Sequence, residues 1–509
     1  MSIANRVIKN TGFLYAKMGI TMFISLYTTR LILNALGVTD FGIFNVVGGA
    51  IAMLGFLHAA MAGATQRFMS FYEGKGDINM QKRIFNISFV LHFCIALFVG
   101  ILLLFAGYFF FNGFLTIPEE RIYAAKVVFG CLIISTMFTV MSVPYEAILN
   151  SHENMLYYSI VGVIESILKL AVAIYIVYTE ADKLIIYGVL MAIIPIIILT
   201  VMRIYCHKKY EECTISIKRY WDYVFMKEMT SFAGFNLLGA SSSMITQYGF
   251  GVVLNSFFGP VLNAAQGVAN QISGQLMVFS NNMMKAVNPV ISKSEGEGNR
   301  TLMLDTSLIS CKFSYLLLAF FAIPFIIETE FILKVWLKNI PEWAVLFVRL
   351  QLLKSLVEQL TFMISRTVVA QGDIKTYTVV KSIINILPII ITYILFNFGS
   401  PPYVLYIVWI FFWGILGGYT NIFFSRKLCG LQYSSYFNKV LLPVSVISLV
   451  MIALGMAMKL LLDSGILRLL LVGLLTTVTY LLVYYFFFIT EMEKNMLKNI
   501  KNRVFKFKK

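Results

Sequence analysis

Long runs of apolar residues follow one another along the whole chain, and they set the first expectation about its structure. The run at residues 90–111, VLHFCIALFVGILLLFAGYFFF, is typical because its apolar residues do not alternate with polar ones. A helix needs about 20 apolar residues to cross the ~30 Å hydrocarbon core of a bilayer. A transmembrane β-strand would instead show alternating segments of about 10 residues. Since backbone groups in lipid must be hydrogen-bonded within their own segment, these runs predict transmembrane helices.

The predicted fold class is an all-α integral membrane protein with about fourteen transmembrane helices. The expected spans are residues 11–34, 41–72, 84–109, 123–149, 156–178, 184–202, 228–256, 263–292, 303–327, 342–365, 382–397, 404–425, 437–458 and 469–490. The first span is expected to be retained, because no small-residue cleavage site follows it. The connecting segments are too short to hold a soluble catalytic domain, so we do not expect an enzyme.

The chain contains an internal repeat. Three pairs of segments match at nearly the same separation: LILNALG (31–37) with VVLNSFFG (252–259), EGKGD (73–77) with EGEGN (295–299), and ILNSHEN (148–154) with VAQGDIK (369–375). The repeat predicts two six-helix lobes followed by two further helices. Since six is even, both lobes enter the membrane from the same side, which predicts a parallel repeat around a central cleft.

The predicted domain boundaries follow from this repeat. They are an N-lobe at 1–220, a C-lobe at 221–430, a terminal helix pair at 431–490 and a basic cytoplasmic tail at 491–509. Lobes that rock against each other expose a central site to each side in turn, which is the mechanical basis of secondary transport. The repeat therefore favours a transporter over a receptor.

Polar side chains follow one face of two predicted helices. In the span 263–292 this face carries Asn263, Gln266, Asn270, Asn281 and Lys285. In the span 342–365 a similar face carries Gln351, Lys354 and Glu358. A polar helix face is not expected to contact lipid, so it packs against another helix or lines a water-filled cavity. We expect Asn263, Gln266, Asn270, Asn281 and Gln351 to line the cleft.

Two acid and base pairs lie deep in predicted spans, each at the helical spacing i, i+4. They are Glu165 with Lys169, and Glu358 with Lys354. Each pair can neutralise itself and hold helices together. Alternatively, the pairs line the cleft, where burial and substrate charge shift the pKa of a carboxyl group. In that interpretation Glu165 and Glu358 are ion-coupling residues for H⁺ or Na⁺.

Basic residues outnumber acidic ones inside the predicted spans. The expected substrate-binding cations are Arg30, Arg67, Lys169, Lys285 and Lys354. Against the two deep carboxylates they make the interior basic, which favours an anionic substrate. For Arg30 and Arg67 the alternative is that the side chain extends to the lipid headgroups.

The formal net charge of +16 fits a membrane protein without invoking nucleic acid. Lys and Arg are concentrated in the segments expected on the cytoplasmic side, which predicts that both termini are cytoplasmic. The basic tail is expected to face anionic lipid. The six cysteines and four histidines show no metal-ligand spacing, so neither a metal nor a cofactor is expected.

Three segments carry a family resemblance: LILNALGVTDFGIFNVVGG (31–49), ATQRFMSFYEGKGD (64–77) and FFGPVLNAAQGVANQIS (257–273). They resemble the Wzx-type polysaccharide flippases of the multidrug/oligosaccharidyl-lipid/polysaccharide exporter superfamily, over residues 1 to about 430. The two terminal helices are as expected for that branch. Arg30 resembles a first-helix cation of related flippases, and Arg67 resembles the arginine that ends the second helix of many members.

The resemblance implies a V-shaped bundle in the bacterial inner membrane. It implies transport of an undecaprenyl-diphosphate-linked oligosaccharide repeat unit for O-antigen, capsule or exopolysaccharide synthesis, with glycan polymerases as partners. The alternative on the same fold is a cation-coupled multidrug antiporter, whose site would favour acidic residues and aromatic cages. A glycan polymerase or ligase would be expected to carry a large outward loop, which this chain lacks.

Overall fold

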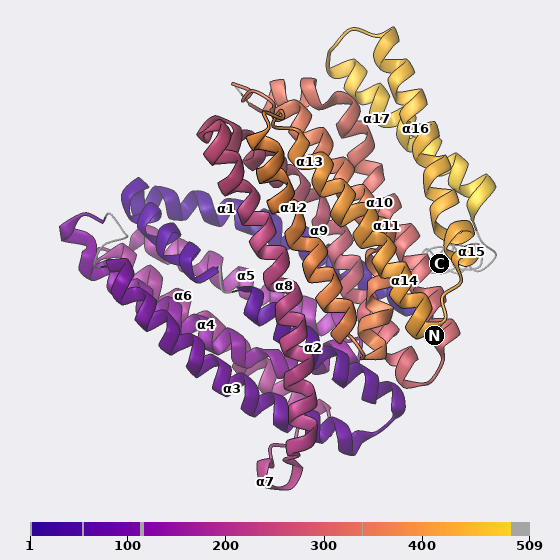
Figure 1. Cartoon of the computed structure of the whole chain (residues 1–509). Coiled ribbons are helices and arrows are strands. Elements are labelled where there is room, and N and C mark those ends of the chain that lie inside the picture. The colour runs from indigo at the N-terminus through magenta and orange to yellow at the C-terminus, as the bar shows by residue number, and fades with distance from the viewer. Residues whose placement is uncertain (1–2, 53–54, 112–116, 338, 490–509) are drawn as a thin grey trace, which may run out of the picture. The chain divides into compact units, whose positions relative to one another are not determined.

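The computed structural model consists of helices joined by short connections (Figure 1), and it describes residues 3–52, 55–111, 117–337 and 339–489. The α-helices are α1 (Ile3–Ala52), α2 (Gly55–Lys75), α3 (Ile78–Phe109), α4 (Ile122–Ser151), α5 (Met155–Tyr178), α6 (Lys183–Lys209), α7 (Ile217–Tyr220), α8 (Tyr223–Phe258), α9 (Pro260–Gly296), α10 (Arg300–Trp336), α11 (Ala344–Gln371), α12 (Lys375–Asn397), α13 (Val404–Trp409), α14 (Gly417–Cys429), α15 (Tyr433–Tyr436), α16 (Leu442–Leu461) and α17 (Ile466–Val483). The described part of the chain has no strand, so the all-α prediction is confirmed. The predicted basic tail at 491–509 lies outside the described residues.

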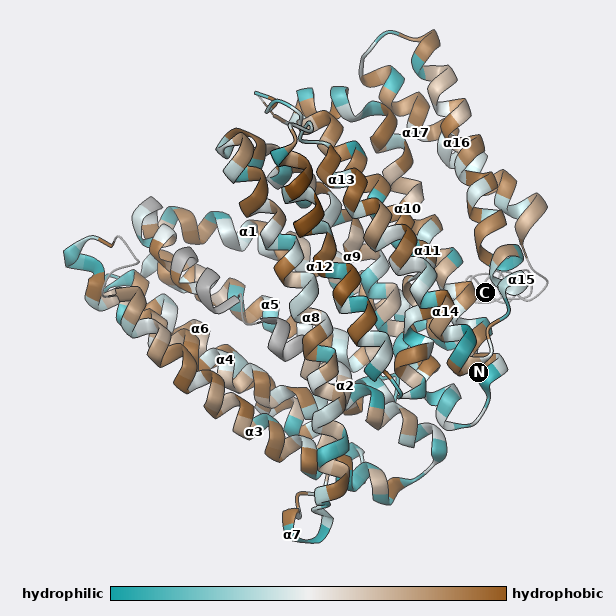
Figure 2. Ribbon diagram, viewed as in Figure 1, coloured by the Kyte–Doolittle hydropathy of each residue, from teal (hydrophilic) through white to brown (hydrophobic). Residues whose placement is uncertain are grey.

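Eleven helices within the described ranges are long and apolar enough to cross a membrane. Figure 2 shows hydrophobic residues along the lengths of these helices. The three other predicted spans are less apolar: 41–72 falls on the end of α1 and on α2, and the other two fall on α9 and α11. For α9 and α11 the reason is the polar face described above. The eleven apolar helices and these three account for the fourteen predicted spans, and the chain is a multi-pass membrane protein.

Two glycines with positive φ interrupt the long helices at equivalent places of the repeat. Gly37, inside α1, has φ 76° and separates the first two predicted spans. Gly259, between α8 and α9, has φ 77°. Glycine takes this backbone conformation without the steric cost that a Cβ would bring. The match of Gly37 and Gly259 agrees with the duplication read from the sequence.

A second structural match lies at the segments EGKGD and EGEGN. Asp77 begins α3 by accepting a hydrogen bond from the Met80 backbone N–H at 3.0 Å. Asn299 begins α10 in the same way, accepting from the Leu302 N–H at 3.1 Å. Each cap follows a glycine with positive φ, Gly76 and Gly298 respectively. The same helix start is therefore built twice.

The chain forms two compact units. One unit comprises Lys9–Ala240 together with Ser292–Gly298, and is called here the N-unit. The other comprises Met1–Ile8, Ser241–Ile291 and Asn299–Lys509, and is called the C-unit. The helices α8 and α9 therefore each contribute residues to both units.

In the N-unit, α4 packs closely against α3 and α6 at glycines. A methyl group added at Gly100 would lie 2.8 Å from the Met137 sulfur, and one at Gly188 would lie 2.9 Å from a Val128 methyl. Small residues let helix backbones approach each other closely. In a membrane this close packing drives helix association, because the hydrophobic effect does not favour contact between helices that lipid already surrounds. These contacts fix α3, α4 and α6 as a layer.

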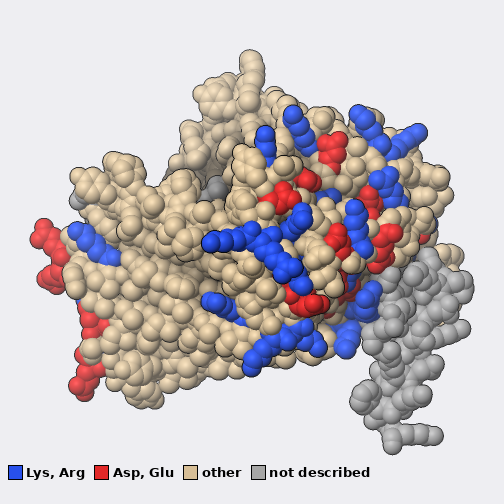
Figure 3. Space-filling view, turned by 90° about the horizontal axis from the view of Figure 1, so that it is seen from below, with Lys and Arg blue, Asp and Glu red and all other residues tan. Residues whose placement is uncertain are grey.

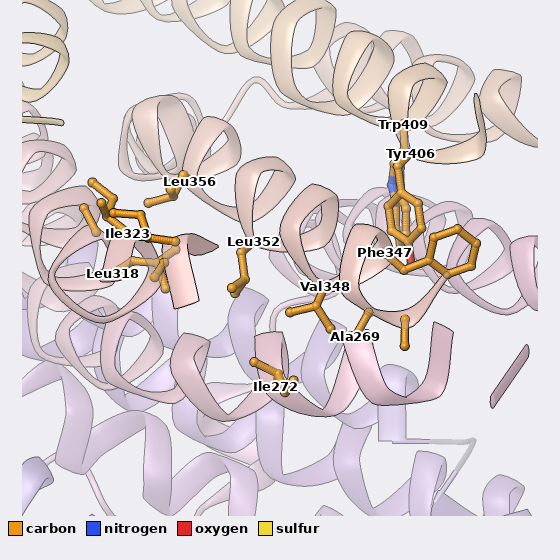
Figure 4. Close-up of a cluster of buried hydrophobic side chains, with 14 of the residues drawn as sticks. Ala269, Ile272, Leu318, Ile323, Phe347, Val348, Leu352, Leu356, Tyr406 and Trp409 are labelled. Atoms are coloured by element: carbon orange, nitrogen blue, oxygen red, sulfur yellow. The ribbon is translucent and has the colours of Figure 1, made fainter. Parts of the chain in front are cut away.

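The core of the C-unit lies where α9, α10, α11 and α13 meet (Figure 4). Its fully buried side chains include Leu318 of α10, Phe347 of α11 and Tyr406 of α13, and the rings of Phe347 and Tyr406 are 5.0 Å apart. The terminal helices α16 and α17 pack against α10. A buried ion pair between Arg468 of α17 and Glu328 of α10, at 2.9 Å, joins them.

Candidate functional site

The predicted pair Lys354 and Glu358 is formed on α11 in the C-unit. The Lys354 Nζ lies 3.0 Å from a Glu358 carboxylate oxygen, and the two side chains are 8% and 21% exposed. The same ammonium lies 4.0 Å from the ring centroid of Trp409 and 4.9 Å from that of Trp413. A cation within about 6 Å of an aromatic face is attracted by its quadrupole. Lys354 therefore has a carboxylate and two indole rings as partners.

The two tryptophans reach Lys354 from consecutive elements. Trp409 is the last residue of α13, and Trp413 lies in a π-helical turn, Ile410–Leu416, between α13 and α14. Trp413 is anchored there because its Nε1–H donates to the Asn385 carbonyl oxygen at 3.1 Å. Inserted π-turns often occur at functional sites, since they shift the faces on which side chains project. The sequence pattern predicted a plain helix here and gave no sign of the turn.

A second lysine, Lys381 of α12, adds to this group of charges. It packs over Gly417, where an added methyl group would lie 2.4 Å from the Lys381 Nζ. The Glu358 charge interacts electrostatically with Lys381. The Glu358 carboxylate thus interacts with two ammonium groups. With two lysines and one glutamate, the cluster of Lys354, Glu358 and Lys381 carries a net positive charge. Sequence reasoning missed Lys381 because it stands one residue before the predicted span 382–397.

The corresponding pair in the N-unit lies on α5. The Lys169 Nζ is 2.6 Å from a Glu165 carboxylate oxygen, and both side chains are about two-fifths exposed, at 41% and 40%. On the same helix, Tyr158 receives the Lys17 ammonium of α1 over its ring at 4.3 Å. Lys17 lies against Gly162, where a Cβ would come within 2.2 Å of it. An isolated lysine inside a predicted span was the signal that would have found Lys17.

The polar face of α9 is only partly explained by helix packing. Ser273 on this helix hydrogen-bonds to Ser355 of α11 at 2.9 Å. Gln266 and Gln351 are buried, Asn263 and Asn270 are half-buried, and Asn281 is exposed. Among the described residues, Asn263 Oδ1, Gln266 Nε2 and Gln351 Oε1 are buried without a hydrogen-bond partner. Such groups normally find a partner, in water or in a ligand.

The predicted cations are distributed over both units. Lys285 of α9 is half-buried in the C-unit. In the N-unit, Arg30 is exposed. Arg67 is buried, with its guanidinium 4.8 Å from the Phe68 ring, 4.7 Å from Phe71 and 5.5 Å from Phe232. Sequence reasoning did not single out two further cations of the C-unit, the buried Lys312 of α10 and the half-buried Arg366 of α11.

Figure 3 shows one face of the molecule on which Lys and Arg side chains lie among Asp and Glu side chains. A charged cluster of the N-unit lies at the ends of its helices. His152 bridges two carboxylates, with Nδ1 3.1 Å from Glu73 and Nε2 2.5 Å from Glu212. Lys293 lies 3.4 Å from Glu73 and 3.6 Å from Glu153. Three carboxylates thus share one lysine and one histidine.

The pKa values in this cluster follow from its contacts. Burial by itself would lower the pKa of His152, but hydrogen bonds to Glu212 and Glu73 outweigh it and raise that pKa to about 9. Burial would raise the pKa of Glu73, but hydrogen bonds from His152 and Gln81 and the charges of His152 and Lys293 lower it to about 2. At neutral pH, His152 is therefore charged and Glu73 is ionised.

No family model matches this chain. No curated protein matches it either. Solved structures share its fold, however. An outward-facing multidrug resistance MATE family transporter of the MOP superfamily aligns with a TM-score of 0.70 at 14% identity, covering 84% of this chain and 96% of that one. A MATE structure in the bent conformation aligns with a TM-score of 0.72 at 14% identity, covering 84% and 96%.

A third structure is a MOP superfamily transporter from Pyrococcus furiosus, aligned with a TM-score of 0.69 at 12% identity over 86% of this chain and 97% of that one. That protein is described as having a binding pocket of reverse polarity that suggests a different function. At these identities the likeness establishes the fold, which is that of MATE transporters.

Proposed function

We propose that this chain is a secondary transporter that moves an anionic amphiphile across the bacterial inner membrane. Its substrate in this proposal is an undecaprenyl-diphosphate-linked oligosaccharide repeat unit for O-antigen, capsule or exopolysaccharide synthesis. The transporter fold supports the general class. The net positive cluster of Lys354, Glu358 and Lys381 supports an anionic substrate.

One observation favours an anionic substrate over an organic cation. The two indole rings of Trp409 and Trp413 and the Glu358 carboxylate are the groups that would hold a cationic drug. In this protein they hold the Lys354 ammonium instead, at 4.0 and 4.9 Å from the rings and 3.0 Å from the carboxylate. An organic cation would have to displace a tethered lysine from its own site.

The same pair suggests how transport is coupled. A substrate diphosphate that contacts Lys354 and Lys381 competes with Glu358 for their ammonium groups, since phosphate and carboxylate bind the same donors. Protonation of Glu358 releases Lys354 for the substrate, whereas an ionised Glu358 restores the internal pair when the substrate leaves. Glu358 is thereby proposed as the ion-coupling residue, with Glu165 as its counterpart in the N-unit.

Complementation of a deletion strain tests the proposal, with surface glycan as the readout and membrane abundance matched. Lys354→Ala and Lys381→Ala are each expected to lower glycan export at least about tenfold, the effect of losing roughly 1.4 kcal/mol of binding. Lys439→Ala, which removes an exposed pair with Asp305, is the matched control. Normal export in both cluster variants, or in the deletion strain itself, would refute the proposal.

A cation-coupled multidrug antiporter is the second candidate, favoured by the Glu358 carboxylate and the two tryptophan rings that all contact the Lys354 ammonium. Ethidium efflux from cells expressing the protein distinguishes the two. Efflux by the wild type that is abolished by Glu358→Gln would support the antiporter. If glycan export depends on Lys354 and no ethidium leaves the cells, the flippase proposal stands.

A further inference from the structure

An apolar groove lies on the membrane-facing side of the N-unit, outside the charged sites described above. It has a volume of about 290 Å³ and is lined from three helices. Its lining residues are Phe89, Phe93, Ala96 and Leu97 of α3, Met137, Phe138, Met141 and Tyr145 of α4, and Leu199, Thr200 and Arg203 of α6. Phe93 and Leu97 are 50% and 42% exposed, so the groove opens outward rather than into the protein core.

The shape of the groove follows from the helix contacts on either side of it. Beyond its apolar end, α3 and α4 come together at Gly100, where Met137 leaves no room for a Cβ. At its other end, Tyr145 closes it by contacting His207 of α6 through a hydrogen bond of 3.3 Å. From Phe89 to Leu97 the groove follows two turns of α3, a length of roughly 12 Å.

The groove is polar at one end only. Arg203 lies there, near enough to Tyr145 and His207 to interact electrostatically with both. The basic last turn of α6, with His207, Lys208 and Lys209, follows Arg203. Thr200 is already satisfied, since its hydroxyl donates to the Ile196 carbonyl at 2.8 Å. The opposite end is lined by Ala96, Leu97 and Met137, which are apolar.

Arg203 is an exposed cation without an internal counter-ion. It forms no ion pair with any residue in the described part of the chain, and no acidic side chain lines the groove. An arginine in a membrane span normally extends toward the headgroup region. Its guanidinium matches a phosphate, which it can bind through two parallel hydrogen bonds.

We propose that this groove is a binding site for an anionic phospholipid. The phosphate of the lipid binds Arg203 at the mouth of the groove, and one acyl chain lies along Phe93, Leu97 and Met137. The groove and the lipid have the same polarity along their lengths. The charged end of the groove, near the C-terminus of α6, faces the lipid headgroup, and its apolar end faces the acyl chain toward mid-membrane. This proposal does not depend on which substrate the protein transports.

The first test measures lipid retention by native mass spectrometry on the full chain purified in neutral detergent. The wild type is expected to retain phosphatidylglycerol at least about tenfold more strongly than phosphatidylcholine. Both lipids carry a phosphate, but the choline cation offsets its charge in phosphatidylcholine, whereas phosphatidylglycerol keeps a net negative charge next to Arg203. Arg203→Gln should abolish this preference, and Ala96→Phe should lower retention of both lipids by filling the groove. Lys427→Gln, an exposed basic residue on α14, should change nothing.

A second test keeps the proposal falsifiable if Ala96→Phe does not fold. Phosphatidylglycerol with a photoreactive group on its acyl chain should label wild-type peptides containing residues 89–97 and 137–145. Labelling confined to other helices would refute the proposal, as would equal retention of the two lipids or an Arg203→Gln variant that keeps the preference. Displacement of phosphatidylglycerol by a lower concentration of undecaprenyl phosphate would also overturn it, because the groove would then belong to a transported lipid.

Discussion

At the residue scale, the molecule places several charged side chains in apolar surroundings together with specific partners. Lys354 has Glu358 and two indole rings, Arg67 has three phenylalanine rings, and Glu328 has Arg468. The energetic consequence is asymmetric. Removing one partner of a buried pair leaves a charge without solvation, which costs far more than the pair contributes when it is complete.

The pair of Arg468 and Glu328 gives a direct measure of that asymmetry. Arg468 is 10% exposed and Glu328 is fully buried. Arg468→Ala is expected to lower the free energy of unfolding by about 3 to 5 kcal/mol, measured by thermal or denaturant unfolding in detergent. The exposed pair of Lys439 and Asp305 provides the control, since Lys439→Ala should change it by less than about 1 kcal/mol. Equal effects of the two variants would contradict the buried-pair interpretation.

The cluster around His152 predicts how stability depends on pH. The pKa of His152 rises from 6.5 to about 9 in the folded protein, so its contribution is complete below about pH 6.5 and is lost as pH rises through 9. The pKa of Glu73 falls from 4.5 to about 2, so its contribution is complete above about pH 4.5 and is lost as pH falls toward 2.

Thermal unfolding of the wild type should therefore show a decrease in midpoint between about pH 6.5 and 9. His152→Gln should start from a lower midpoint and show a weaker decrease over the same interval, because the titrating group is absent. A variant with the same pH profile as the wild type would show that His152 does not titrate in this range.

At the element scale, most of the helices could be predicted from the sequence. Apolar runs and their lengths are enough to locate the spans, because the bilayer fixes the length of a spanning helix. The polar faces of α9 and α11 were also visible, and the pairs at i, i+4 follow from helical geometry alone. The π-turn that follows Trp409 and carries Trp413 could not be predicted, since it depends on how α13 and α14 pack against α11 and α12.

Two glycines mark a close approach between the end of α9 and the end of α2. A Cβ at Gly74 would lie 2.2 Å from the Lys293 carbonyl oxygen, and one at Gly296 would lie 2.0 Å from the Phe71 carbonyl oxygen. Backbone atoms leave no flexible end that could move aside. Gly74→Ala and Gly296→Ala are each expected to destabilise the N-unit by about 1 to 3 kcal/mol, as overpacking does.

Gly63 on α2 is the control, because an added methyl group there has no neighbour within 4 Å. Gly63→Ala should be neutral or slightly stabilising, since alanine favours helix more than glycine does. Thermal unfolding of the three purified variants compares them directly. If all three behave alike, the close approach does not constrain the fold.

At the scale of the whole molecule, the repeat was predictable because short segments kept their sequence where the backbone needs it. The equivalent helix starts at Asp77 and Asn299, each after a glycine of positive φ, are the clearest examples. The membership of the two units was not predictable. No pattern in the sequence indicates that Ser292–Gly298 packs with the first half of the chain, since that depends on contacts far apart in sequence.

The orientation of the chain in the membrane remains a prediction from the distribution of Lys and Arg. It is tested by single cysteines introduced into a cysteine-free background. A cysteine replacing Lys218, in α7, should react with an impermeant reagent only from the cytoplasmic side. A cysteine replacing Glu180, between α5 and α6, should react only from outside. The reverse pattern would invert the predicted topology.

The division of α9 between the two units has a consequence for how the protein is made. The N-unit closes only when Ser292–Gly298 joins Lys9–Ala240. During translation, the ribosome must therefore complete α8 and nearly all of α9 before the first unit can acquire its last contacts. Until then, Glu73 and Glu153 lack their ion pairs with Lys293. The incomplete N-unit is thus expected to stay associated with the membrane-insertion machinery while α8 and α9 are synthesised. A protein whose two halves fold independently would not need this additional time.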